Sequence, residues 1–102
     1  MTGENSRENA REDVARGEEA LSAARHLCAG GFNNDAVSRA YYAAFHAVSA
    51  WFALGNRLFT KHTALRAAVH RDLVHAGLWS PALGEAFDAL SELRDTGDYG
   101  GA

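Results

Sequence analysis

The stretch that decides the fold of this 102-residue chain is Asn34–Leu54, NDAVSRAYYAAFHAVSAWFAL. Alanine is common in it, and alanine favours helix because it loses no side-chain entropy there. At about 100° per residue, the larger apolar side chains fall on one side of a helix, which predicts a core face. The residues of this face are Val37, Tyr41, Ala44 and Val48 and, more loosely, Phe45, Trp51 and Phe52. The stretch therefore predicts a long helix with one side buried in an all-α core.

Three further helices are predicted around this one. Apolar residues at helical spacing predict a first helix that ends at Gly30-Gly31, a third over 61–76 and a fourth that begins at Ser80-Pro81. The predicted caps are Asn33-Asn34-Asp35, Thr60 and Ser80. Because short loops join the helices, we expect an up-down antiparallel four-helix bundle. Its expected limits are 9–97, between a disordered N-terminal tail (1–8) and a short C-terminal tail (98–102).

A polar stripe lies on the other side of the central helix and contains Asp35, Arg39, Tyr42 and His46. Arg39 and His46 are two turns apart, about 10 Å along the axis, which leaves room for a phosphate or a ribose. A guanidinium suits phosphate oxygens, and an imidazole exchanges a proton near neutral pH. The pair can thus bind a phosphodiester and deprotonate a 2′-hydroxyl without a metal. The same spacing also allows Arg39 to pair only with Asp35, and His46 to pack in an interface.

Composition restricts the class of protein. The net charge of −3 argues against binding nucleic acid through overall positive charge, although a local basic patch remains compatible with it. The single cysteine forms no intrachain disulfide, and no stretch approaches the ~18 apolar residues of a membrane span. The polar N-terminus is unlike a signal peptide. We therefore expect a cytoplasmic protein that does not contact a membrane. The five histidines show no metal-site spacing, so no metal and no cofactor is expected.

Three motifs occur in order along the chain: Ser38–Ala47 (SRAYYAAFHA), Lys61-His62-Thr63, and the segment Arg94–Tyr99. Together they resemble the HEPN domain, and in particular small uncharacterised prokaryotic HEPN proteins that share S-R-A-Y-Y-A-x-F-H-A. The resemblance covers roughly residues 20–99. It implies a dimerising helical bundle of four or five helices, here without the final helix that relatives carry.

Many HEPN proteins are metal-independent ribonucleases, including toxins paired with a minimal nucleotidyltransferase antitoxin. Their signature is an arginine, four to six residues, and a histidine at the dimer interface; six residues separate Arg39 from His46. The resemblance thus implies Arg39 and His46 as catalytic candidates. The binding candidates are Ser38, Tyr42, His62, Arg94, Asp98 and Tyr99.

The favoured function is an RNA- or nucleotide-binding homodimer of a toxin–antitoxin or defence system, with a minimal nucleotidyltransferase as its partner. The acidic net charge and the lack of a histidine after Arg94 favour this binding role. One alternative is a metal-independent endoribonuclease that uses Arg39 and His46. Another is a purely structural dimerisation module.

Overall fold

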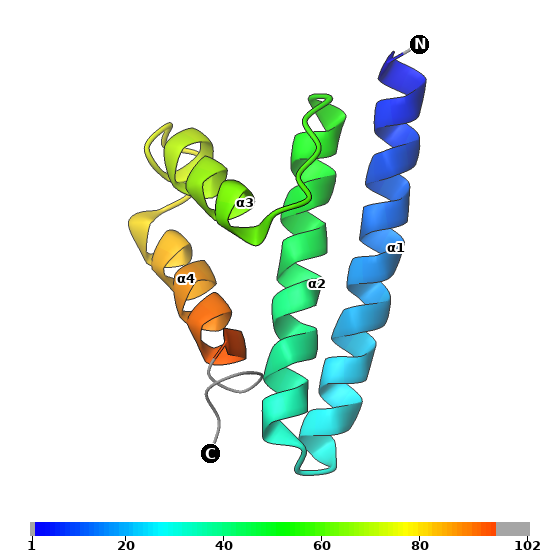
Figure 1. Ribbon diagram of the computed structural model, residues 1–102, viewed down its shortest axis with the longest axis vertical. Helices are drawn as coiled ribbons and strands as arrows, with labels where there is room; N and C mark the ends of the chain where they lie inside the picture. The colour runs from blue at the N-terminus through cyan, green and yellow to red at the C-terminus, as the bar shows by residue number, and fades with distance from the viewer. Residues whose placement is uncertain (1, 96–102) are drawn as a thin grey trace.

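The computed structural model describes residues 2–95 of the chain, and this part is all helical with short connections. Its elements, in order, are α1 (Thr2–Ala29), α2 (Asn33–Leu54), α3 (His62–Ala68), η1 (Val69–Val74) and α4 (Pro81–Asp95). Figure 1 shows α1 and α2 side by side and antiparallel, with α3 and α4 on the other side of α2. No strand occurs within residues 2–95. The predicted all-α helical bundle is therefore confirmed.

The main core lies where α2 meets the three later elements. Tyr41, Leu65 and Val69 are the largest side chains that are almost completely buried. The remaining core residues are Val48, Phe52, Ala68, Leu73 and Phe87. Tyr41 is thus a core residue, as its place on the apolar face of the central helix predicts.

A second, smaller interface joins α1 to α2, and it is built from small side chains. Ala10 of α1 packs with Ala50 and Ala53 of α2. At Gly17 of α1, a Cβ atom would lie 3.3 Å from the carbonyl oxygen of Ala43. Because the two backbones approach so closely, the polar side chains at the edges of both helices border the same space.

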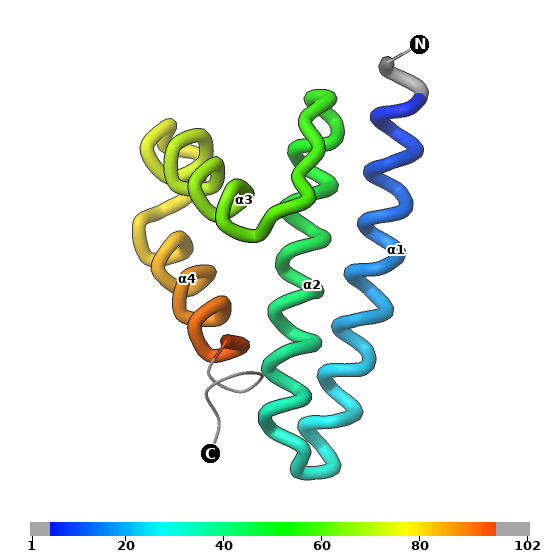
Figure 2. The backbone as a smooth tube through the Cα atoms, viewed as in Figure 1, coloured from blue at the N-terminus to red at the C-terminus, as the bar shows by residue number. Residues whose placement is uncertain are grey.

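The α3–η1–α4 unit forms a hairpin that covers the far side of α2 (Figure 2). η1 is a π-helical segment, in which the His75 N–H bonds to the His70 carbonyl oxygen at 2.9 Å. Gly84 of α4 lies against η1, since a Cβ there would be 2.7 Å from a Val74 methyl group. An ionic cluster joins the two arms: the Asp88 carboxylate accepts from Arg66 Nε at 2.6 Å and lies 2.8 Å from His70 Nε2.

Several expected boundaries differ from the structure. Residues 2–8 are helical rather than a disordered tail. The reason is the length of α2: Ser6 and Ala10 are buried because α1 covers α2 as far as its last turns. The C-terminal tail expected over 98–102 lies outside the described residues. No helix within the described part combines the length and the apolar character that crossing a bilayer requires.

The predicted helix starts and caps agree only in part with the structure. α2 begins at Asn33, where a helix start is predicted, but its cap position is Phe32 rather than one of the predicted residues. The cap position of α3 is Lys61, so the cap predicted at Thr60 is wrong, and neither helix has a side-chain cap hydrogen bond. The predicted start at Ser80-Pro81 is confirmed, because the Leu83 N–H donates to Ser80 Oγ at 3.2 Å. The expected third helix over 61–76 is divided between α3 and η1.

Candidate functional site

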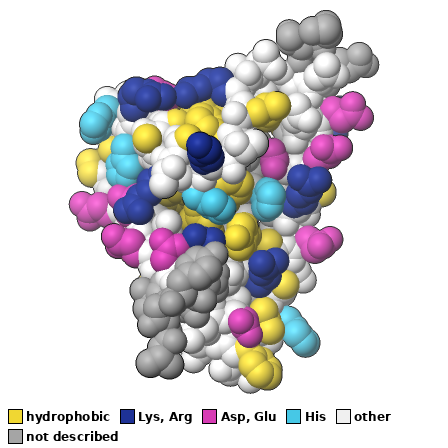
Figure 3. Space-filling view, viewed as in Figure 1, with side chains coloured by type: hydrophobic (Ala, Val, Ile, Leu, Met, Phe, Trp, Pro, Cys, Tyr) yellow, Lys and Arg dark blue, Asp and Glu magenta, His cyan; other side chains and the backbone are white. Residues whose placement is uncertain are grey.

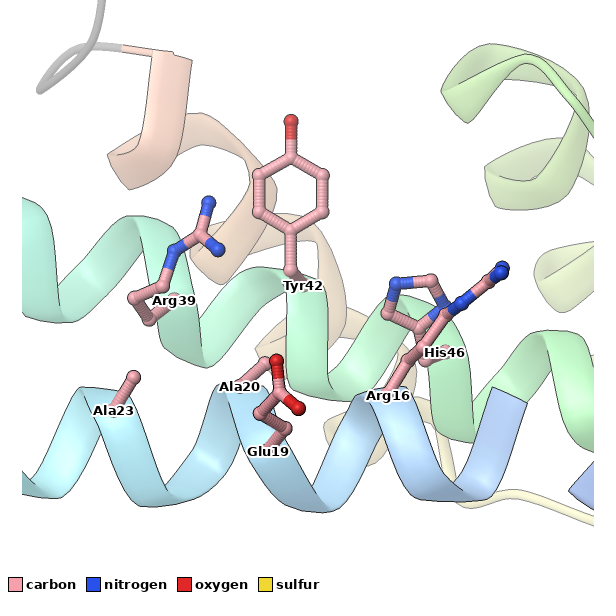
Figure 4. Close-up of a pocket in the computed structure, with 7 residues that line it drawn as sticks. All are labelled: Arg16, Glu19, Ala20, Ala23, Arg39, Tyr42 and His46. Carbon is pink, nitrogen blue, oxygen red and sulfur yellow. The ribbon is translucent and has the colours of Figure 1, made fainter. Parts of the chain in front are cut away.

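Basic side chains gather on one face of the molecule. Figure 3 shows histidine and arginine side chains close together over α2 and the neighbouring parts of the bundle. A cavity of about 300 Å³ lies between α1 and α2. The side chains that line it, drawn in Figure 4, are Arg16, Glu19, Ala20, Ala23, Arg39, Tyr42 and His46. The Arg39–His46 stripe of α2 therefore faces a matching stripe of α1.

His46 is held by a carboxylate from the opposite helix. Its Nδ1 lies 3.0 Å from Oδ1 of Asp13 in α1, and both side chains are about four-fifths buried, at 21% and 18% exposure. A carboxylate only accepts hydrogen bonds when it is ionised, so Nδ1 of the neutral imidazole carries the hydrogen. The Asp13 contact consequently orients the ring and directs Nε2 away from α1's carboxylate.

Arg39 is exposed at the edge of the cavity. Its guanidinium carbon lies 5.0 Å from the centroid of the Tyr42 ring, within the range of a cation–π contact. Among residues 2–95 it forms no ion pair with Asp35, so the pairing that the four-residue spacing allows is not made. Its guanidinium N–H groups remain available to an anionic ligand.

Arg94 of α4 is a second arginine in contact with Tyr42. Its Nη1 donates to the Tyr42 hydroxyl oxygen at 3.2 Å, and its guanidinium carbon lies 5.1 Å from the centroid of the Tyr41 ring. Burial lowers the pKa of Arg94, but hydrogen bonds to Asp95 and Tyr42 outweigh this effect, so its pKa is raised above its usual value. Arg94 is therefore a permanent cation that holds the Tyr42 hydroxyl.

His62, at the beginning of α3, joins the same group of aromatic rings. Its Nδ1 lies 2.7 Å from the Tyr41 hydroxyl oxygen, and its ring centroid is 4.6 Å from that of Phe45. Burial and then the Arg94 charge lower its pKa below the usual histidine value, with Asp95 acting in the opposite direction. His62 is consequently neutral at pH 7.

The structure thus brings three of the predicted site residues into one cavity: Arg39, Tyr42 and His46. Arg94 touches the cavity through Tyr42, and His62 lies next to it across Phe45. Ser38 is buried and does not line the cavity. Asp98 and Tyr99 lie outside the described residues.

The sequence interpretation missed the contribution of α1. Asp13, Arg16 and Glu19 follow one another at steps of three residues, which places them along one side of a helix. That periodicity is visible in the sequence, but it does not reveal which neighbour the side faces. Within residues 2–95, no three His, Cys, Asp or Glu side chains are arranged to hold a metal ion.

Comparison with known proteins identifies the protein family to which the chain belongs. A HEPN domain family model matches residues 10–102, so the chain belongs to the HEPN domain family. It is also 38% identical over 85 residues to a UPF0332 protein of Thermotoga maritima. The match covers 83% of this chain and 64% of that relative, so the chain spans a little under two thirds of the relative's length. No solved structure matches the chain significantly.

Proposed function

We propose that the protein binds RNA, through a phosphodiester held in the cavity between α1 and α2, as part of a toxin–antitoxin or defence system. The observation that carries this proposal is that two arginines, Arg16 and Arg39, line a cavity that is also lined by His46. Its volume lies at the lower end of the range for ligand sites, which suits one phosphate with its sugar.

The charge distribution indicates that an RNA phosphate is attracted by the arginines at the cavity and not by the net charge of the chain. The chain as a whole carries −3, and Glu19 adds a carboxylate to the wall. Phosphate binding therefore depends on the arginine side chains at this place, and it is expected to weaken as salt increases.

Substituting Arg39 by alanine is expected to weaken binding of a fluorescent single-stranded RNA about fivefold to tenfold. It is also expected to lower the slope of log K against log salt by about 0.7, the value for one lost phosphate contact on a single strand. Fluorescence anisotropy over a salt series measures both. Arg11→Ala is the matched control, since Arg11 is an exposed arginine of α1 outside the cavity. Equal affinities for the two variants would contradict the proposal.

A second candidate function is metal-independent endoribonuclease activity. The Asp13–His46 hydrogen bond favours it, because a carboxylate that holds Nδ1–H leaves Nε2 able to take a proton from a 2′-hydroxyl. Arg39 then holds the phosphodiester, and Tyr42 orients Arg39 through their cation–π contact. The 2′-oxygen, whose proton has passed to His46 Nε2, attacks the adjacent phosphorus. The bond to the 5′-oxygen breaks, a 2′,3′-cyclic phosphate forms, and the 5′-oxygen takes a proton from water and leaves as a hydroxyl.

We further propose that the chain forms a homodimer and partners a minimal nucleotidyltransferase. Large apolar side chains of α1 and α2 support an interface away from the cavity: Val14, Leu21, Trp51 and Leu54 are all 41–57% exposed. Such uncovered side chains are typical of protein–protein contact sites when they lie together. The alternative is a purely structural role, in which the Arg39 stripe itself is the dimer interface.

Trp51→Glu is expected to convert a dimer of the 10.9-kDa chain into a monomer in light scattering, because a charge at an apolar interface loses its hydration. Leu78→Glu is the control, as Leu78 is 63% exposed in the connection before α4. A change of mass in Arg39→Ala, with none in Trp51→Glu, would place the interface at the stripe instead. Co-expression with a nucleotidyltransferase encoded nearby, followed by co-purification, tests the partnership.

A further inference from the structure

Two histidines flank Phe45 on the face that carries the cavity. The ring centroid of His62 is 4.6 Å from that of Phe45, and the ring centroid of His46 is 5.6 Å from it. In each histidine, Nδ1 is the engaged nitrogen. Neither Nε2 bonds to a residue within 2–95, and neither is among the buried polar atoms left without a partner. Both Nε2 atoms are therefore accessible to a ligand.

The partner of one Nδ1 atom accepts a hydrogen bond, and the partner of the other can donate one. Asp13 offers His46 a carboxylate, which accepts, so the hydrogen of neutral His46 lies on Nδ1. Tyr41 offers His62 a phenolic hydroxyl, which can donate. A phenol is a better donor than acceptor because its ring withdraws electron density from the oxygen.

The Tyr41 hydroxyl keeps its hydrogen. Burial has the largest effect on the pKa of Tyr41 and raises it, while a hydrogen bond with Ser91 of α4 lowers it to a smaller extent. The pKa of His62 is lowered, which favours a neutral ring with one nitrogen able to accept. Since the phenol is the stronger donor of the two groups, the Tyr41 hydrogen points to Nδ1 of His62 across their 2.7 Å contact.

We propose that His46 and His62 are held in opposite tautomers, so that His46 presents a bare Nε2 acceptor and His62 presents an Nε2–H donor to one bound strand. Asp13 and Tyr41 are the positioning residues. This inference rests on the proposed function and names its substrate class. A ligand that satisfies both nitrogens carries a hydroxyl for His46 and an anionic oxygen for His62. Single-stranded RNA longer than one nucleotide has both, whereas DNA lacks the hydroxyl.

Long-range ¹H–¹⁵N NMR of the ¹⁵N-labelled full chain at pH 7.5 reads the tautomer of each histidine directly, without a ligand. We expect Nδ1–H for His46 and Nε2–H for His62. Asp13→Ala is expected to return His46 alone to the mixture of tautomers shown by exposed His75, the internal control. Tyr41→Phe, which keeps the buried ring, is expected to move His62 alone towards that mixture. The same tautomer at both histidines in the unmodified protein would overturn the proposal.

A binding comparison tests the ligand class. His46→Ala is expected to reduce the affinity for RNA to that for DNA of the same sequence. His62→Ala is expected to weaken both about tenfold, the worth of one hydrogen bond to an ionic group. If RNA does not bind although the tautomers are opposite, the proposed function fails and the tautomer assignment stands. If RNA binds through Arg39 but the tautomers are alike, only the present inference fails.

Discussion

Replacing His46 with alanine is expected to lower RNA cleavage by about 10²- to 10⁴-fold, the usual contribution of a positioned general acid or base. His46 is the histidine that lines the cavity, and because Asp13 holds its Nδ1, its Nε2 is the nitrogen left for proton transfer. The rate of fragment formation from total RNA or tRNA, followed on denaturing gels with EDTA present, measures the loss.

His75→Ala is the matched control, since His75 is exposed at the end of η1 and lies outside the cavity. It should cleave at the unmodified rate. RNA left identical by the unmodified protein and by His46→Ala would exclude the endoribonuclease and leave RNA binding as the function.

Tyr41→Ala is expected to destabilise the fold by about 3–5 kcal/mol, the usual range for truncating a large buried aromatic residue. Tyr41 is 1% exposed and packs against Phe87 and Phe45. Its loss also removes the hydroxyl that holds His62. For a domain of this size, the melting temperature should fall by roughly 15–30 °C.

Trp51→Ala provides the contrast, since it removes a still larger aromatic side chain from the same helix. Trp51 is 56% exposed in the single chain, so at protein concentrations too low for the proposed dimer to form, the free energy of unfolding should change by less than about 1 kcal/mol. Thermal unfolding followed by circular dichroism compares the two variants. Equal losses of melting temperature at that dilution would contradict the exposure of Trp51 in the single chain.

Much of the fold is predictable because the periodicity of the central helix is strong. Tyr41, Val48 and Phe52 lie on the predicted face and are buried. Trp51, which the pattern places only loosely on the same face, is 56% exposed, so a position at the edge of the apolar face is only partly covered. The π-helical turn of η1 could not be predicted, since it depends on the packing of Val69 and Leu73 against α2 and α4.

One half of the candidate site can be predicted from the sequence and the other half cannot. The α2 half, with Arg39, Tyr42 and His46, follows from spacing within one helix. The α1 half does not, because Asp13 is 33 residues from His46 in the chain. Which side of α1 meets α2 is set by the small residues at their contact, such as Gly17, and by the three-residue connection between the helices. The packing of α1 on α2 is a tertiary interaction, which the periodicity of each helix does not predict.

The packing of α1 indicates that the candidate site can be lost by partial unfolding of this helix. α1 packs almost entirely against α2, through alanines and a glycine that bury little apolar area each. The core of Tyr41, Leu65 and Phe87 lies on the other side of α2. Partial unfolding that releases α1 therefore costs less free energy than global unfolding, and it would show as faster amide hydrogen exchange in α1 than in α2. Such an opening removes Asp13 and Arg16 while the core remains, so any ligand that bridges α1 and α2 acts as a clamp on the first helix.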